Sequence, residues 1–404
     1  MKTTTIGKIA DVQTGPFGSQ LHKEDYVTNG TPIVTVEHLG QKTFTTQNLP
    51  RVSTKDKVRL AKYTMHSGDI IFSRVGSVDR CSFATENNDG WLFSGRCLRL
   101  RVADVDVNSE YLYYYFCQEA VKELIRNHAV GATMPSLNTK LLSELPFSYP
   151  GKEQQTKIVS LLSDIDAKIE RNASINQNLE AQAQAIFKSW FVDFEPFQDG
   201  KFVDSELGPI PQGWRVVSLE DIAFYNNEKL PASKAMLDTY ISTDNMLPNR
   251  GGIELASNVP STGCVTVFAK NDVLLSNIRP YFRKIWYASL SGTCSTDVLC
   301  FRAKAKVESE YLFCVLNNES FFEYVMSGAK GTKMPRGDKR QMMSYRIVMP
   351  YQDILENFSR TLKPLVDHQR RNTIESRCLA ALRDTLLPKL MSGEIDVSDV
   401  NILC

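Results

Sequence analysis

One stretch decides the fold, KEQQTKIVSLLSDIDAKIERNASINQNLEAQAQAIFKSW, which runs from Lys152 to Trp190. It contains no proline or glycine, and its apolar residues recur in alternating steps of four and three. This seven-residue repeat is typical of a coiled-coil helix. The seam positions are Ile158, Leu162, Ile165, Ile169, Asn172, Asn176, Leu179, Ala183, Ile186 and Trp190. A helix of roughly 55–60 Å needs a partner helix of similar length to cover its seam.

The partner helix is predicted in the same chain, because adding 200 to each seam position gives a second, more polar seam from Phe358 to Leu390. In this second seam Asn372 repeats Asn172. The same offset relates three upstream residues, Gly131, Met134 and Pro135, to Gly331, Met334 and Pro335. A repeat this long lies outside the range of solenoids. It indicates two copies of a globular domain, each followed by a long helix.

Composition restricts the kind of protein. The 404 residues are enough for one to three domains, and the net charge of +1 means that any nucleic-acid surface depends on locally placed charge. Nine cysteines without a Cys-x-x-Cys pair, and only five histidines, do not favour a zinc site. The chain has no run of 18 apolar residues and no apolar leader. We therefore expect a cytoplasmic protein with reduced thiols and no membrane partner.

The pattern predicts five parts. They are a first mixed α/β domain at 1–150, a long helix at 151–195, a linker rich in proline and glycine at 196–213, a second α/β domain at 214–350, and a second long helix with a tail at 351–404. The first long helix should end near Phe194, before Pro196. The second should end or kink at Pro388, with a stop at Ser392-Gly393.

Within the domains, Asp69–Ser73 and Asp272–Ser276 are predicted to be equivalent buried strands, each followed by a basic turn. Ser109 to Asn127 is predicted to be one helix with Ser109 as its N-cap. Its aromatic residues are expected in the core rather than on a base-stacking surface: Tyr111, Tyr113, Tyr114, Tyr115 and Phe116.

No catalytic motif stands out. The sequence lacks a phosphate-binding glycine loop, a dinucleotide fingerprint, a zinc-protease motif and a hydrolase nucleophile elbow. Asp166-Ala-Lys168 has the spacing of some metal nucleases, but its place on the long helix favours helical charge pairing. We expect no catalytic residue, no cofactor and no metal, which indicates a binding protein.

Basic residues gather at Arg51–Lys62 and Lys330–Arg346, and in the two turns that follow the equivalent strands. Each cluster alone is compatible with a solvated surface. Their placement in loops, and the recurrence of the basic turn and of the Gly/Met-Pro loop in both copies, favour contacts to DNA phosphates and base edges. The candidate DNA-binding residues are Ser19, Lys23, Arg74, Ser77, Arg80, Thr133, Arg279, Arg283, Lys284, Lys330, Lys333 and Arg336.

Several stretches resemble a known family. They are Gly15–Ser19, Gly68–Arg74, Ile186–Phe191, Leu207–Trp214 and Leu386–Ile395. Over its whole length the chain resembles the DNA-specificity (S) subunit of type I restriction-modification enzymes. The second domain departs from the pattern, because Asn226–Ser233 stands where a counterpart of Gly15–Ser19 would be.

The resemblance implies an α+β protein in which two target-recognition domains are joined by two long antiparallel coiled-coil helices, with an internal pseudo-twofold duplication. It implies that each domain reads one half of a bipartite site in double-stranded DNA. Two methyltransferase subunits and motor-nuclease subunits would then methylate or cleave the DNA, while this chain is not catalytic. Two alternatives stay open: a coiled-coil adaptor that binds only proteins, and a DNA-binding nuclease with an unrecognised site.

The duplication also makes a prediction about the two helices. If they pair antiparallel, Asn172 and Asn372 should lie opposite each other and form a polar layer that disfavours shifted registers. The alternative is that both asparagines face solvent and that Ile175 takes the seam position.

Overall fold

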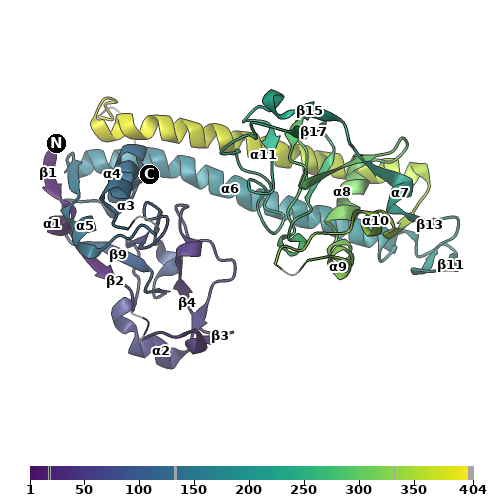
Figure 1. Cartoon of the computed structure of the whole chain (residues 1–404). Coiled ribbons are helices and arrows are strands. Elements are labelled where there is room, and N and C mark those ends of the chain that lie inside the picture. The colour runs from purple at the N-terminus through teal and green to yellow at the C-terminus, as the bar shows by residue number, and fades with distance from the viewer. Residues whose placement is uncertain (17, 19, 132–133, 332, 399–404) are drawn as a thin grey trace. The chain divides into compact units, whose positions relative to one another are not determined.

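The computed structural model describes residues 1–16, 18, 20–131, 134–331 and 333–398, apart from the side chain of Lys23 (Figure 1). The chain divides into two compact units. The first unit holds Met1–Arg171 and the C-terminal part of the chain from Glu375, and the second holds Asn172–Ile374. Each unit therefore combines one globular domain with a segment of each long helix. No described helix is both long enough and apolar enough to cross a membrane.

The long helices are α6, Lys152–Phe191, and α11, Gln352–Ser392. In the first unit Asp166 contacts Arg383, and two residues further along α6 Lys168 contacts Glu375. In the second unit Asn172 contacts Asn372, and Gln369 contacts Asn176. Partner numbers fall along α11 as they rise along α6, so the two segments are antiparallel in each unit, as predicted.

The ends of these helices correct one expectation. Helix α6 ends at Phe191, three residues before the predicted Phe194. Helix α11 does not end at Pro388 but continues to Ser392, where Gly393 follows with a φ of +80°. The predicted stop at Ser392-Gly393 is therefore confirmed. A helical proline costs about 3 kcal/mol. The buried side chains around it, Leu387, Leu390 and Met391, offset that cost by packing into the core of the first unit.

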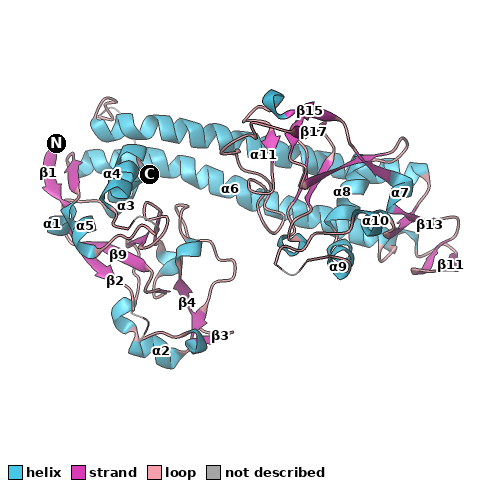
Figure 2. Ribbon diagram, in the orientation of Figure 1, coloured by secondary structure: helices cyan, strands magenta, loops and turns pink. Residues whose placement is uncertain are grey.

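Within its described residues, the first unit contains one two-stranded and two four-stranded sheets. Figure 2 shows strands of this unit. The pair is antiparallel, β1 (Lys2–Thr5) with β10 (Pro146–Tyr149). One four-stranded sheet has the order β2 (Ala10–Thr14), β9 (Cys97–Val102), β6 (Ile70–Ser73), β7 (Cys81–Phe83). The other has the order β3 (Tyr26–Val27), β5 (Arg51–Val52), β4 (Thr31–Val34), β8 (Leu92–Phe93), with β4 and β8 parallel. The α-helices are α1 (Ile6–Ile9), α2 (Thr54–Arg59), α3 (Ser109–Cys117), α4 (Glu119–His128) and α5 (Thr139–Glu144).

The second unit repeats these elements in the same chain order, except that α2 has no counterpart among its described residues. Strand β13 (Arg215–Ser218) pairs with β22 (Arg346–Met349). The first four-stranded sheet has the order β14 (Ala223–Tyr225), β21 (Val298–Ala303), β18 (Val273–Ser276), β19 (Ile285–Tyr287). The helices are α7 (Leu219–Ile222), α8 (Ser309–Asn317), α9 (Glu319–Ser327) and α10 (Lys339–Met343). The linker adds a hairpin of β11 (Phe202–Ser205) and β12 (Gly208–Pro211). This repetition confirms the duplication.

The units differ in their other four-stranded sheet. In the second unit its order is β15 (Lys229–Pro231), β17 (Cys264–Phe268), β20 (Gly292–Cys294), β16 (Tyr240–Ile241). Strands β16 and β20 are parallel, like β4 and β8. However, β17 pairs with β20, whereas its counterpart β5 pairs with β4. The duplicated domains thus share one sheet and have diverged in the other.

One predicted helix is two helices. Residues Ser109 to Asn127 form α3 and α4, which are separated at Gln118 in an extended conformation. The N-cap is Asn108 rather than Ser109, since the Asn108 side chain accepts hydrogen bonds from the N–H groups of Glu110 and Tyr111. Tyr111 and Tyr114 are buried, as expected of core residues.

A buried ion pair fixes the central strand in both units. Asp69 precedes β6 and accepts two hydrogen bonds from Arg101, at 2.7 Å each. Asp272 precedes β18 and accepts two from Arg302, at 2.8 and 2.7 Å. Both carboxylates are buried. Bidentate geometry of this kind holds an arginine in one orientation, so these two arginines support the sheet and are not free to reach a ligand.

Candidate nucleic-acid interface

In the first unit, the turn after β6 lies against a hairpin whose arms meet at Val130 and Ser136. The Ser73 hydroxyl closes the turn by donating to the carbonyl of Val75 at 2.9 Å. The Gly76 N–H then donates to the carbonyl of Pro135 at 2.9 Å, and the Leu137 N–H to that of Arg74 at 2.8 Å. Two loops more than 50 residues apart in the chain therefore form one surface.

The second unit builds the same surface. The Ser276 hydroxyl donates to the carbonyl of Ile278 at 3.2 Å. The Arg279 N–H donates to the carbonyl of Pro335 at 2.8 Å, and Lys330 and Arg336 close the hairpin with two backbone hydrogen bonds of 2.9 Å. We call these two places the recognition surfaces. The same backbone contacts occur in both recognition surfaces, but the side chains at the equivalent positions differ.

Two predicted residues act within the fold. The backbone of Ser73 pairs with Arg80 as that of Ser276 pairs with Lys284, so Arg80 and Lys284 are counterparts. The Arg80 guanidinium donates to the carbonyl of Leu39, and the Lys284 ammonium donates to that of Thr243 at 2.7 Å. Burial lowers the pKa of Lys284. In each unit this side chain therefore links the turn after the buried strand (β6 or β18) to the loop that follows a strand of the other sheet (β4 or β16).

Two residues of the predicted set, Arg279 and Arg283, have a backbone in the left-handed region, and Arg283 has a φ of +51°. Arg279 lies directly against the hairpin. Its φ is +50°, in the left-handed region, and its counterpart in the first unit is Gly76 with a φ of +77°. The Arg279 Nε atom is buried and has no hydrogen-bond partner among the described residues. An arginine in a conformation that favours glycine is strained, and such strain is typical of functional positions.

The other basic residues of the second surface are partly paired with acids. Arg283 contacts Glu319, Arg336 contacts Asp297 at 3.1 Å, and Lys330 contacts Asp338 at 2.6 Å. The Lys330 ammonium, with two backbone N–H groups, lowers the pKa of Asp338 to about 2. Exposed pairs of this kind contribute little to stability. Lys333 is exposed in the same hairpin.

The first surface carries fewer of the predicted groups. Arg74 is half-buried, with its guanidinium 3.4 Å from the carbonyl of Gly95, and Ser77 is exposed. Ser19 and Thr133 lie outside the described residues, as does the side chain of Lys23. The basic cluster Arg51–Lys62 is not a loop, because it includes α2, where Arg59 pairs with Asp56.

Sequence reasoning missed two features of the second surface. Tyr281 and Phe282 are exposed on the turn between Arg279 and Arg283, with ring centroids 4.6 Å apart. The second feature is Arg250, which contacts the same turn. Its φ is +61°, and its N–H donates to the carbonyl of Arg283 at 3.0 Å. The aromatic pair between two arginines is itself a sequence signal for nucleic-acid binding. The Arg250 contact joins segments that no local pattern connects.

The nuclease-like pair has a structural role. Asp166 accepts hydrogen bonds from the Tyr114 hydroxyl and from Arg383, both at 2.7 Å, and Lys168 pairs with Glu375 at 3.1 Å. The expected charge pairing is present, but it runs between the two long helices rather than along one. Within the described part of the chain, no three His, Cys, Asp or Glu side chains gather as metal ligands would.

Comparisons with known proteins agree with this architecture. A family model for the type I restriction modification DNA specificity domain matches residues 1–181. The MjaIX specificity subunit, a type I restriction enzyme subunit of Methanocaldococcus jannaschii, is 28% identical over 312 residues, which cover 73% of this chain and 71% of that protein. The HindI specificity subunit of Haemophilus influenzae is 23% identical over 423 residues, covering 85% of this chain and 90% of that protein.

The fold has a solved counterpart. The crystal structure of the type I restriction-modification S subunit from M. genitalium superposes with a TM-score of 0.55, at 16% identity, and covers 96% of each chain. The duplicated units, the paired long helices and these comparisons lead to one conclusion: the first 181 residues match the type I restriction modification DNA specificity domain, and the chain is similar over most of its length to type I restriction enzyme specificity subunits.

Proposed function

We propose that the chain is the DNA-binding specificity subunit of a type I restriction-modification complex, and that it reads a bipartite target. Residues 1–150 would read one half-site and residues 214–350 the other. One observation carries the proposal: both units build a recognition surface on the same backbone contacts and display different side chains there. A shared scaffold with different displayed groups is what two different half-sites require.

The proposal assigns the chemistry to partner subunits. Two methyltransferase subunits and motor-nuclease subunits would act on the DNA in the cytoplasm, while this chain supplies recognition without catalysis. Basic side chains such as Lys333 and Arg336 would contact phosphates. Arg279 and Arg74 are the better placed to read base edges, because their backbones are fixed by hydrogen bonds to the neighbouring hairpin.

The decisive experiment exchanges residues 1–150 for the corresponding domain of another family member and sequences the methylome of cells with and without the chimera. We expect one half of the methylated site to change and the other to be retained. Loss of both halves in a folded chimera would contradict independent reading by the two domains.

The same preparation separates the alternatives. A protein-only adaptor would show no salt-dependent, sequence-specific gel shift in the presence of the methyltransferase subunit. A nuclease would cut DNA in a metal-dependent manner as the purified chain alone. We expect the gel shift and no cutting.

A further inference from the structure

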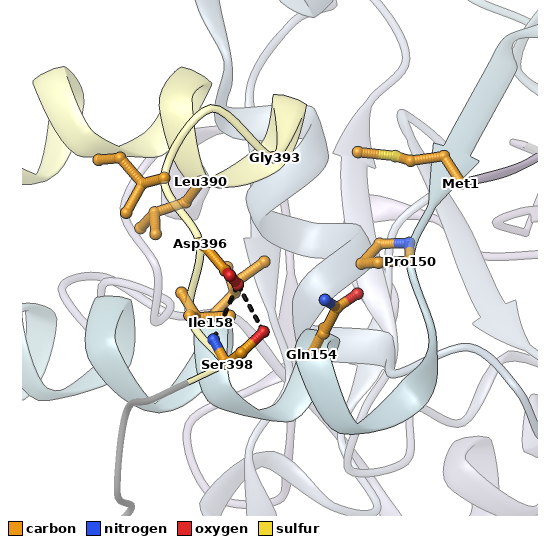
Figure 3. A pocket seen from close by; sticks show the side chains of 10 residues that line it. Met1, Pro150, Gln154, Ile158, Leu390, Gly393, Asp396 and Ser398 are labelled. Carbon is orange, nitrogen blue, oxygen red and sulfur yellow. Dashed lines mark hydrogen bonds between the residues drawn. The ribbon is translucent and has the colours of Figure 1, made fainter.

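The first unit contains a cavity of about 350 Å3 where the start of α6 meets the end of α11 (Figure 3). Its lining includes Met1, Gln154, Ile158, Leu390 and, from the tail after α11, Asp396 and Ser398. We call it the end cavity. It is large enough for a ligand group, since ligand sites begin at roughly 300 Å3. No described DNA-surface residue lines it.

The internal duplication identifies the same place in the second unit. The 200-residue offset pairs Ile158 with Phe358 and Leu390 with Trp190. The strand register makes Met1 and Trp214 counterparts. Lys2 pairs with Tyr149 in the first unit, and Arg215 pairs with Met349, the residue 200 positions later, in the second. Met1 and Trp214 each stand one residue before this pair.

In the second unit this place is filled by aromatic rings. Trp214 lies 4.8 Å from Phe197 and 5.9 Å from Phe191, and Phe191 lies 4.8 Å from Phe358, between ring centroids. Trp214 is only 7% exposed, whereas its counterpart Met1 is 64% exposed. The first residue of the second domain thus supplies an indole that closes the end of the second unit, and the described tail of the first unit supplies no ring.

We propose that the end cavity receives a tryptophan side chain from a partner protein, seated as Trp214 is seated in the second unit. The end cavity is partly open to solvent, so a ring can enter it, and filling it gains both apolar burial and dispersion contacts. A buried indole also needs an acceptor for its N–H. Gln154 and Asp396 offer oxygen atoms at the rim, and Asp396 is held there by the Ser398 N–H at 2.9 Å and its hydroxyl at 2.6 Å (Figure 3).

The probe for this site is a synthetic peptide of this chain's own residues 195–215, which carries Phe197 and Trp214. We expect it to bind the full-length chain with one-to-one stoichiometry in isothermal titration calorimetry. The Trp214→Ala peptide should bind at least tenfold more weakly. A second probe, N-acetyl-tryptophanamide, should shift the methyl NMR signals of Ile158 and Leu390, which removes any dependence on how the peptide folds.

A blocking variant tests the location. Gln154→Trp places a ring into the cavity from an exposed helix position, so it should weaken peptide binding at least tenfold. Gln177→Trp is the matched control, because Gln177 is an equally exposed glutamine on the same helix and lies in the second unit. Both variants should bind DNA as the parent does. A failure to bind the peptide can therefore be distinguished from a failure of the proposed DNA-binding function.

Three outcomes would overturn the proposal. One is that neither probe binds or shifts a signal. Another is equal binding of the peptide to Gln154→Trp and to the parent. The third is binding that appears only after the chain is truncated behind Ser398, because the occupant would then be the chain's own tail rather than a partner.

Discussion

One contact between the long helices and the globular domain is polar in the first unit, and its counterpart in the second unit is apolar. In the first, Asp166 of α6 joins Tyr114 of α3 to Arg383 of α11. The 200-residue offset relates these residues to Val366, Cys314 and Ala183, which are all buried in one apolar cluster of the second unit. Burial and the Asp166 carboxylate raise the pKa of Tyr114, so its hydroxyl stays a donor.

This difference teaches how a duplicated scaffold tolerates divergence. An apolar contact needs only matched volume, whereas a buried polar contact needs every partner present. At this contact the first unit therefore depends on three specific residues, whereas the equivalent contact of the second unit depends on matched apolar volume; the buried polar contact between α8 and α11 of the second unit, from Ser359 to Glu310 at 2.8 Å, lies at other positions. Removing one member should affect the two units very differently.

The largest effect is expected from Asp166→Ala. It removes the acceptor shared by the Tyr114 hydroxyl and Arg383, and Arg383 keeps only its exposed pair with Asp384 at 2.8 Å. Breaking a buried pair costs roughly 3–5 kcal/mol, and the 30% exposure of the Arg383 side chain places the expected loss at about 3 kcal/mol. Hydrogen exchange of α3 should report it, with α8 of the second unit as the internal reference.

A double change sharpens the result. Asp166→Val with Arg383→Ala installs the apolar residues of the second unit, and Tyr114 keeps its contact with Lys42 at 3.1 Å. We expect this variant to be more stable than Asp166→Ala, since no half-buried guanidinium remains that has lost its buried carboxylate. If it is the less stable of the two, the polar network is not the cause of the loss.

The next effect concerns the recognition surfaces. Arg279→Gly gives the second unit the residue of the first, Gly76. Relief of left-handed strain, about 1–2 kcal/mol, is largely offset by the flexibility of glycine, so stability should change little. DNA binding should weaken by about 1–3 kcal/mol if Arg279 reads a base, with specificity relaxed at one position of one half-site.

The matched control for Arg279→Gly is Lys306→Gly. Lys306 is exposed, also has a positive φ, of +72°, and follows the end of β21 that is remote from the turn. Competition gel shifts at several salt concentrations should show no specificity change for this variant. Equal losses in both variants would mean that only charge, and not the position of Arg279, matters.

A smaller effect is expected where the two helix segments cross in the second unit. Asn172 is 1% exposed and donates to the carbonyl of Asn372 at 3.5 Å, which confirms the predicted pairing. Asn372 in turn donates to the Asn176 side chain at 3.0 Å. Replacing Asn172 and Asn372 with leucine should raise stability by on the order of 1 kcal/mol, measured as a higher Tm. A lower Tm would show that the polar layer stabilises the pair.

The smallest effect compares two helix caps. Asp338 caps α10, and its counterpart Asn138 caps α5. The pKa of Asp338 is lowered from 3.8 to about 2, so its contribution is complete above pH 3.8 and is lost as the pH falls through about 2. Amide NMR signals of Arg340 and Gln341 should titrate in this window, while that of Leu141 should not. Asp338→Asn should abolish the titration.

Sequence alone determined the helices and the duplication. The seam from Ile158 to Trp190 is a local pattern, and a seven-residue repeat has one efficient way of burying its apolar residues. The offset that relates Asn172 to Asn372 needs only comparison of the chain with itself. The buried strand Ile70–Ser73 and the aromatic core of α3 were predictable for the same reason, since periodicity and apolar runs report burial.

Only the tertiary structure decided what the basic residues do. Nothing local distinguishes Arg80, which ties down the carbonyl of Leu39, from Arg279, which lies strained on the recognition surface. The same holds for Asp166, whose partners are 52 and 217 residues away. A side chain's role depends on which distant backbone groups packing brings within hydrogen-bond reach, and the sequence pattern records periodicity but not those encounters.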